Sequence, residues 1–452
     1  MLKRLRTYLN SGHERSIVAK KNILAMVLIK GLNILISLLL VPLTIHYVNT
    51  ATYGIWLTLS SIVAWISFFD IGLNNGLRNR FAEAKANNDI PLAQRLVSTT
   101  YAILVLIFIP LLIIFLIANQ WINWGRILNA PIEMQAQLPM IASIVVGYFC
   151  IKFILSTINI ILIADQNPAG AAARGLVEQI VTLLIIFILT KFTHGSLINL
   201  TLALCISPLL IVLYFNFALF NKKYSEFKPT LSLVDFRLSK DLFGLGFKFF
   251  IIQIAAIVQF QTANYIIIQN FGAEQVTNYN IAYKYFGILI MSMGIITAPL
   301  WSSVTDAYTR KDYDWVLIIS KKYLKAGFLL ALVGIFMLIG SDKIYNLWIG
   351  KGEIQISFSL SFWMFLYAIV NIFGSIYVGI LNGIGALKIQ FTASLFSPIL
   401  FIMLVVVLIR GLNWGISSVV IAAVLANFNA FILAPMQFYK IFKQQKQKIW
   451  IA

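Results

Sequence analysis

The sequence predicts an all-α polytopic membrane protein with about twelve transmembrane helices, arranged as two six-helix lobes around a central cavity. Composition is the first observation behind this fold class. Of the 452 residues, 60% are hydrophobic and 11% are charged, whereas roughly a quarter of the residues in a soluble domain are charged. Apolar runs of about twenty residues, long enough to cross a bilayer, also recur from end to end. No segment is left for a soluble catalytic domain.

An internal repeat is the second observation. In the stretch Tyr47–Tyr101, an apolar run ends at Asp70 and a basic segment follows. The pattern returns after Tyr279, where an apolar run leads to Asp306 and basic residues follow again. Two matched halves in a membrane protein are typical of secondary transporters. With six helices in each half, both halves enter the membrane from the same side, which predicts a parallel repeat.

The apolar runs define the predicted spans and the longest hydrophilic connector divides them into six plus six. The spans are expected at about 22–46, 52–71, 97–118, 138–163, 174–192, 197–219, 247–271, 278–304, 323–341, 358–381, 388–409 and 414–438. The predicted regions are a basic N-terminal segment (1–21), an N-terminal lobe (22–220), a basic linker (221–246), a C-terminal lobe (247–438) and a basic tail (439–452).

The basic residues indicate topology. The formal charge is +19, which in a soluble chain would suggest nucleic acid, but here Lys and Arg gather in alternate short loops, as the positive-inside rule requires. This pattern places both termini and the linker in the cytoplasm. The only cysteines, Cys150 and Cys205, lie in apolar runs, and the three histidines lie far apart, so we expect neither a disulfide nor a metal site. No Walker, GxSxG or HExxH motif occurs, which disfavours an enzyme or an ATP-driven pump.

Three lysines fall inside predicted spans, where a charge is costly and should face water, a partner or an anionic ligand. Lys152 lies near mid-membrane with no carboxylate in its own helix, so it is the strongest candidate for function; the alternative is pairing with Glu178. Lys30 and Lys284 lie nearer helix ends, where snorkelling to the interface competes with a role in the cavity.

Uncharged polar residues form stripes on several predicted helices, and these stripes are expected to face a common interior. The candidates are Asn33, Ser37, Asn159, Gln253, Gln261, Asn264, Asn280 and Asn371.

Carboxylates near the helix ends have nearby basic partners. Glu178 lies four residues after Arg174, and Asp306 lies four residues before an arginine, spacings that form ion pairs on a helix. Structural roles are therefore favoured, with Glu178 kept as the alternative site for a coupling proton or cation. Asp70 lies where the second span meets Arg78, which indicates an inner-gate contact or a turn cap.

Three phrases carry a family resemblance: Tyr53-Gly-Ile-Trp, the stretch Phe69-Asp-Ile-Gly-Leu-Asn-Asn-Gly-Leu77, and the Arg-Asn-Arg-Phe-Ala-Glu-Ala that follows it. With the helix count, the repeat and the basic tail, the chain resembles the polysaccharide flippases of bacterial O-antigen and capsule clusters. These belong to the multidrug/oligosaccharidyl-lipid/polysaccharide exporter (MOP) superfamily.

The resemblance implies a two-lobed transporter of the bacterial inner membrane that moves undecaprenyl-pyrophosphate-linked oligosaccharide from the cytoplasmic to the periplasmic leaflet. Lys30, Lys152 and Lys284 would then face the pyrophosphate, and the uncharged stripes would meet the sugar. Partners implied are the lipid bilayer and the polysaccharide polymerase and chain-length regulator proteins, without nucleic acid. No cofactor is expected; coupling to protons or Na⁺ stays open.

Two alternatives come from other functions. A cation-coupled multidrug exporter shares the architecture but calls for acidic residues in the cavity, where this chain has lysines. An integral-membrane polysaccharide polymerase or ligase would have a large external loop with clustered Arg and His. The outer loops here are short and nearly uncharged, which favours the flippase.

Overall fold

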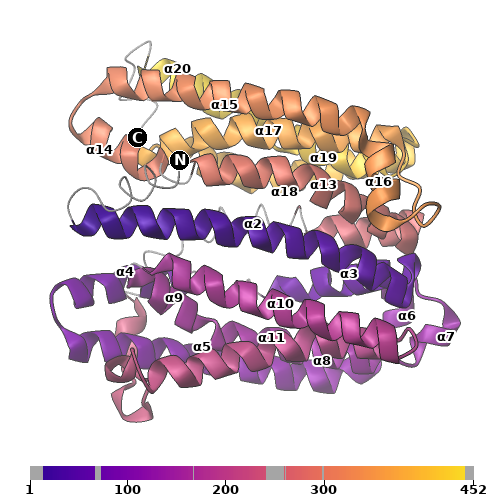
Figure 1. Cartoon of the computed structure of the whole chain (residues 1–452), viewed down its shortest axis with the longest axis horizontal. Coiled ribbons are helices and arrows are strands. Elements are labelled where there is room, and N and C mark those ends of the chain that lie inside the picture. Colours follow the sequence, from indigo (N-terminus) through magenta and orange to yellow (C-terminus); the bar gives the residue numbers. More distant parts are fainter. Residues whose placement is uncertain are drawn as a thin grey trace. The chain divides into compact units, whose positions relative to one another are not determined.

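The computed structural model describes residues 14–66, 73–165, 167–240, 259, 261–297 and 300–442. These residues form helices and short loops, without any strand among them. An apolar chain in hydrocarbon can satisfy its backbone N–H and C=O groups within one segment only as a helix. The α-helices (Figure 1) are α2 (Glu14–Val48), α3 (Thr50–Ala64), α4 (Leu73–Ala86), α5 (Ile90–Ala118), α6 (Trp124–Ile127), α7 (Ile132–Gln135), α8 (Leu138–Leu155), α9 (Thr157–Ala164), α10 (Pro168–Phe192), α11 (Leu197–Phe220), α13 (Ala273–Thr297), α14 (Leu300–Thr309), α15 (Tyr313–Ile339), α16 (Ser341–Ile349), α17 (Phe358–Gly383), α18 (Lys388–Val406), α19 (Ser417–Ala426) and α20 (Ala434–Phe442).

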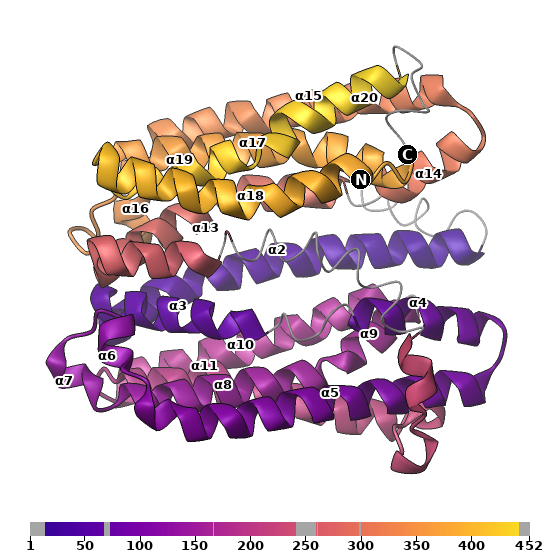
Figure 2. The same cartoon turned by 180° about the vertical axis from the view of Figure 1, so that it is seen from behind.

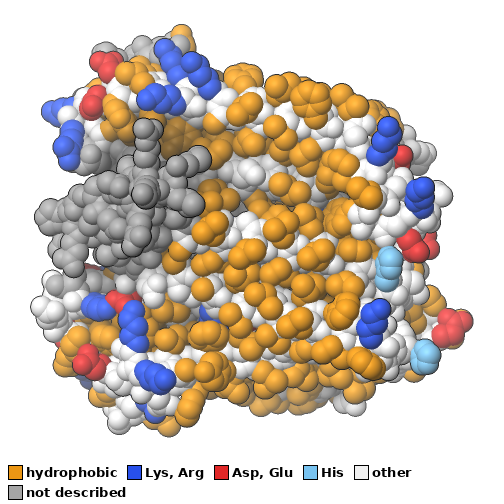
Figure 3. Space-filling view, in the orientation of Figure 1, with side chains coloured by type: hydrophobic (Ala, Val, Ile, Leu, Met, Phe, Trp, Pro, Cys, Tyr) orange, Lys and Arg blue, Asp and Glu red, His pale blue; other side chains and the backbone are white. Residues whose placement is uncertain are grey.

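The helices have the lengths and surfaces of membrane spans. In the described part of the chain, nine helices are long and apolar enough to cross a bilayer, and the bent pair of α19 and α20 makes a tenth. On the face drawn in Figure 3, hydrophobic side chains cover the middle of the helices, while Lys and Arg lie near the helix ends. The predicted span at 247–271 lies mostly outside the described residues. The protein is therefore a multi-pass helical membrane protein, as the sequence predicts.

The chain divides into two compact units. The N-terminal unit comprises Met1–Asn49 and Val63–Phe250, and the C-terminal unit comprises Thr50–Ile62 and Ile251–Ala452. Residues 50–62, the greater part of α3, are grouped with the C-terminal half of the chain in this division, whereas chain order predicts them in the N-terminal lobe. Apolar runs predict a helix here but not its packing partner, because that partner is more than two hundred residues away.

Close backbone contact holds α3 within the C-terminal unit. The Thr277 hydroxyl donates to the Thr50 carbonyl oxygen at 2.8 Å. Four residues along α3, Gly54 lies so near the first turn of α13 that a Cβ atom built on it would be 1.9 Å from the carbonyl oxygen of Ala273. Glycine at position 54 of the Tyr53-Gly-Ile-Trp phrase therefore allows the two helices to approach.

We expect Gly54→Ala to destabilise the protein by about 1–3 kcal/mol, because the added methyl meets rigid backbone and forces α3 away from α13. Thermal denaturation of the detergent-purified protein measures this loss. Gly287→Ala, within α13, is the matched control. A Cβ there has no described neighbour within 4 Å, and alanine is the better helix former. Equal melting temperatures for the two variants would contradict the close approach.

The linker after α11 packs against the N-terminal unit. Two carboxylates hold it there. Asp165, at the end of α9, binds Lys85 of α4 and accepts from the Tyr224 hydroxyl at 2.7 Å. Asp235 pairs with Arg95 of α5. Figure 2 shows this segment beside the beginning of α5. The part of the predicted linker that the structure describes is thus a docked element rather than a free tether.

Candidate binding sites in the two units

The N-terminal unit contains a buried cluster of two cations and one carboxylate. Lys152 of α8 lies with Nζ 3.0 Å from Oε2 of Glu178, and the other carboxylate oxygen, Oε1, pairs with Arg174. The Lys152 ammonium also donates to the Tyr148 hydroxyl at 2.8 Å. Asn159 Oδ1 accepts from Arg174 Nε at 2.5 Å. One carboxylate shared between two cations leaves this cluster with a net charge of +1.

Local sequence explains how these groups meet. The N-terminus of α10 is fixed by Asn167, whose side chain caps the Gly170 N–H. Arg174 and Glu178 then follow one helical turn apart on the same face, as their spacing predicts. The break between α8 and α9 after Leu155 lies between Lys152 and Asn159. Lys152 contacts the Glu178 carboxylate of α10, and Asn159 contacts the Arg174 guanidinium of the same helix.

Exposure distinguishes the two cations. The Arg174 side chain is 5% exposed and that of Glu178 is 9% exposed, whereas Lys152 is 27% exposed. Arg174 therefore lies behind the carboxylate and orients it. Lys152 is the cation of this cluster that a ligand can reach.

Lys152 and Glu178 line a cavity of about 410 Å³ within the N-terminal unit. Helices α2, α8, α10 and α11 form its wall. Two amide oxygens in this wall, Asn33 Oδ1 and Gln179 Oε1, are buried and have no hydrogen-bond partner among the described residues. Unpaired buried acceptors are rare in folded proteins and call for an explanation such as a bound donor. Hydroxyl or ammonium groups of a ligand are donors of this kind.

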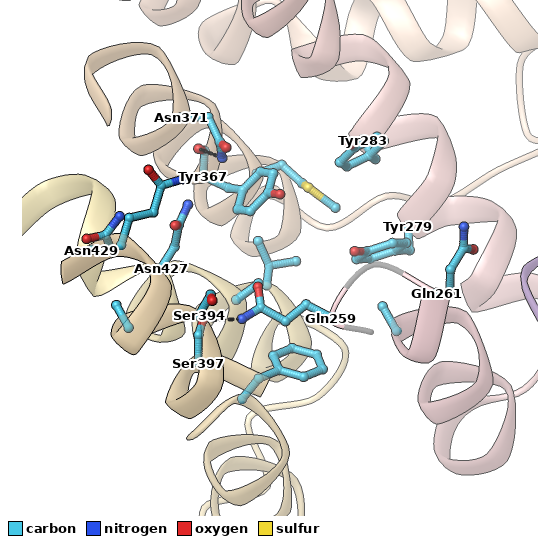
Figure 4. A pocket seen from close by; sticks show the side chains of 17 residues that line it. Gln259, Gln261, Tyr279, Tyr283, Tyr367, Asn371, Ser394, Ser397, Asn427 and Asn429 are labelled. Carbon is cyan, nitrogen blue, oxygen red and sulfur yellow. Dashed lines mark hydrogen bonds between the residues drawn. The ribbon is translucent and has the colours of Figure 1, made fainter. Parts of the chain in front are cut away.

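The C-terminal unit contains a second cavity of about 460 Å³, and its chemistry is different. Figure 4 shows side chains from opposite walls that face the same space. None of the described residues that line it is charged. Its polar lining consists of carboxamides and hydroxyls: Gln259, Gln261, Tyr279, Tyr283, Tyr367, Asn371, Gln390, Ser394, Ser397, Asn427 and Asn429.

A broken helix supplies one wall of this second cavity. Segments Ser417–Ala426 and Asn429–Phe442 are bent by 43°, and a π-helical stretch (Asn429–Leu433) follows the break. The Ser397 hydroxyl of α18 donates to the carbonyl oxygen of Ala426 at 2.7 Å, which satisfies backbone at the break as interrupted membrane helices require. The interruption brings Asn427 and Asn429 to the cavity.

Three aromatic rings form the facing wall. Tyr279 and Tyr283 of α13 stack with ring centroids 6.4 Å apart and an interplanar angle of 15°. Tyr367 of α17 lies 6.2 Å from Tyr283. Tyrosine offers an apolar ring face with a polar tip, so this wall can contact a ligand in both ways.

The three predicted cationic ligands are divided between the two units. Lys152 and Lys30 belong to the N-terminal unit, but Lys30, on α2, is not part of the cavity lining. Lys284 belongs to the C-terminal unit, where its ammonium lies 3.5 Å from the Tyr53 hydroxyl. Lys152 alone among the three lines one of these two cavities.

The predicted uncharged stripes divide in a similar way. Asn33 lines the first cavity, and Gln261 and Asn371 line the second. Asn264 and Asn280 instead hydrogen-bond to each other at 2.8 Å. The Asn264 amide also donates to the Ser61 hydroxyl. Polar stripes on adjacent helices can satisfy each other, so a stripe alone does not identify a ligand site.

Three further candidates are placed only by their backbone or lie outside the described residues, and two others lie outside both cavities. Asp70 and Gln253 lie outside them, and Asp306 lies on α14 without a described side chain. Arg78 is exposed on α4. Ser37 lies on α2 and does not line the first cavity. Gate, ion-coupling and sugar roles for these residues stay predictions.

Most residues of the second cavity lie outside the predicted polar stripes. Gln390, Ser394 and Ser397 recur at i, i+4 and i+7 on α18, which makes a polar stripe as regular as the predicted ones. The Asn427-Phe-Asn429 phrase marks the broken helix in the last span, which also contains Pro435. Both signals are present in the sequence, but only the fold brings them to the same space.

Comparison with known proteins is consistent with this architecture. A curated protein of Yersinia pseudotuberculosis, described as "Putative O-antigen export protein", is 23% identical over 367 residues, which cover 79% of this chain and 81% of that protein. No protein-family model matches the chain. The similarity confirms the resemblance to polysaccharide exporters that the sequence phrases indicate.

Solved structures identify the fold. The inward-facing structure of a multidrug resistance MATE family transporter of the MOP superfamily matches with a TM-score of 0.73 at 16% identity, over 90% of this chain and 96% of that one. A MOP superfamily transporter from Pyrococcus furiosus matches with a TM-score of 0.68 at 16% identity, over 97% and 98% of the two chains. The chain therefore has the all-helical fold of the MOP superfamily transporters, and its sequence is similar to the curated protein described as "Putative O-antigen export protein".

Proposed function

We propose that the protein is a flippase that carries undecaprenyl-pyrophosphate-linked oligosaccharide repeat units across the bacterial inner membrane, from the cytoplasmic to the periplasmic leaflet. The N- and C-termini lie in the cytoplasm in this proposal. Glycans assembled from these units, such as O-antigen, capsule or exopolysaccharide, would be extended by a polysaccharide polymerase under a chain-length regulator. The fold supports transport, and the exporter similarity supports this substrate.

The cluster around Lys152 is the observation that carries the proposal. A diphosphate entering a low-dielectric cavity loses hydration and needs positive charge in compensation. The cluster has a net charge of +1, and Lys152 is both its more accessible cation and a residue of the cavity wall. A phosphate oxygen can replace Glu178 as the acceptor for the ammonium without leaving the carboxylate unpaired, because Arg174 stays bound to it.

The same cluster weighs against a multidrug exporter for cationic compounds. Such a substrate would need free negative charge, but Glu178 is already shared between two cations. Its carboxylate would have to lose a partner for each cation that it binds. The described part of the first cavity thus favours an anionic ligand.

The test is the leaflet location of the lipid-linked oligosaccharide in spheroplasts with and without the protein. A glycan-modifying reagent that does not cross the membrane labels only the outer leaflet. We expect labelling in cells that contain the protein and accumulation of unlabelled intermediate in cells that lack it. Equal labelling in both strains, with every other MOP superfamily gene of the strain removed, would overturn the proposal.

A further inference from the structure

The geometry points to a second ligand subsite, in the C-terminal unit, that binds uncharged sugar residues of the transported oligosaccharide. This inference rests on the proposed function, because it assigns the glycan part of that substrate to the cavity lined by carboxamides and tyrosines. In the proposed function the Lys152 cluster binds the charged pyrophosphate linkage. The carboxamides and tyrosines of the second cavity would bind the neutral sugars.

The lining of the cavity has the groups that a neutral sugar requires. Carboxamides both donate and accept hydrogen bonds, which matches hydroxyl groups that do the same. Asn371, Asn427 and Asn429 reach the space from two different helical segments (Figure 4). The rings of Tyr283 and Tyr367 offer apolar faces against which the C–H face of a pyranose can pack. A volume of about 460 Å³ accommodates a small number of sugar rings.

Other ligand classes fit less well. A pyrophosphate or a sugar carboxylate would be buried without a cation, because no described lining residue is charged. A bound Ca²⁺ or Mg²⁺ would lack the carboxylate that such sites normally provide. An apolar lipid tail would leave many carboxamides without partners. A neutral, hydroxyl-rich ligand satisfies the lining and costs no buried charge.

The helix break gives the subsite its position. Asn427 and Asn429 flank the bend in the last span. Asn371 lies on α17, and its side-chain amide donates to the Tyr367 carbonyl oxygen at 2.8 Å. The Asn371 side chain also hydrogen-bonds to the Tyr367 hydroxyl, so the amide oxygen of Asn371 is the group that can address a ligand. Discrimination between sugars therefore depends on the groups presented by Asn371, Asn427 and Asn429.

The experiment uses the full chain in lipid nanodiscs and saturation-transfer difference NMR, which detects weak sugar binding. The probe is the reducing oligosaccharide that mild acid releases from the lipid-linked intermediate accumulated by cells lacking the protein. We expect saturation on its uncharged sugar residues. Asn427→Leu should weaken binding about tenfold, the effect of leaving a hydrogen bond unmade. Tyr283→Leu should weaken it similarly, whereas Tyr283→Phe keeps the ring and most of the affinity.

Asn270→Leu is the matched control, because Asn270 is an exposed amide of the same unit outside the cavity. Wild-type melting temperatures establish that the variants are folded. Binding that is absent, or equal in Asn427→Leu, Tyr283→Leu and the control, overturns the subsite while the flippase proposal stands. If cells lacking the protein accumulate no intermediate on the inner leaflet, the flippase proposal itself fails.

Discussion

Glu178→Ala is expected to destabilise the N-terminal unit by about 3–5 kcal/mol, because it leaves two cations without their shared carboxylate. Arg174, with a side chain 5% exposed, cannot recover hydration in place. Lys152 would keep only the Tyr148 hydroxyl as a partner among those described here. The thermal denaturation midpoint of the detergent-purified protein should fall by several degrees, with lower abundance in the membrane.

The exposed Glu133→Ala variant is the control for loss of a carboxylate. A double variant sharpens the test. Arg174→Met with Glu178→Leu removes the buried pair together, a replacement that is often neutral or stabilising. We expect its denaturation midpoint to lie nearer the wild type than that of Glu178→Ala. A double variant that is less stable than the single one would show that the cluster contributes more than charge compensation.

The sequence predicts this cluster in part. The Arg174–Glu178 ion pair follows from a spacing of four on one helix and is present in the structure. The sequence favours a functional role for Lys152 and offers pairing with Glu178 as the alternative, and the structure contains that pair. Helical periodicity cannot decide between a ligand-binding role and this ion pair, because Lys152 and Glu178 lie on different helices whose packing depends on the whole unit. The fold adds that Lys152 is both paired and accessible.

Helix positions were predictable for a physical reason, but their assignment to units was not. Hydrocarbon requires long apolar runs, so length and composition identify α5, α10 or α17 without knowledge of their neighbours. The packing of α3 with the C-terminal unit depends on the close approach at Gly54, a contact between residues far apart in the chain. Chain order alone predicts that α3 belongs to the N-terminal lobe.

The second cavity shows a different limit. Asn264 and Asn280 have the polar spacing expected of a ligand face, yet each satisfies the other. Asn427 and Asn429 do not stand out in the composition of the last span. The bend between α19 and α20 nevertheless brings them to the cavity that Tyr283 and Tyr367 also line. Sequence periodicity reports which face of a helix is polar. Whether that face meets another helix or a cavity is decided by tertiary packing.

Lys152→Ala is expected to reduce export of the oligosaccharide about ten- to a hundredfold, because hydrogen bonds to charged groups contribute about 1.5–3 kcal/mol. The protein should remain folded, since Glu178 keeps its pair with Arg174 and no buried charge is left alone. The cluster then carries no net charge and cannot offset a diphosphate. Surface glycan and outer-leaflet labelling measure export, and immunoblotting of membranes measures abundance.

Lys191→Ala removes an exposed lysine from the same unit and should export normally. Lys152→Arg should retain part of the activity, because it preserves the charge but not the compact ammonium geometry. Normal surface glycan in Lys152→Ala cells would remove Lys152 from substrate binding and limit its role to pairing with Glu178.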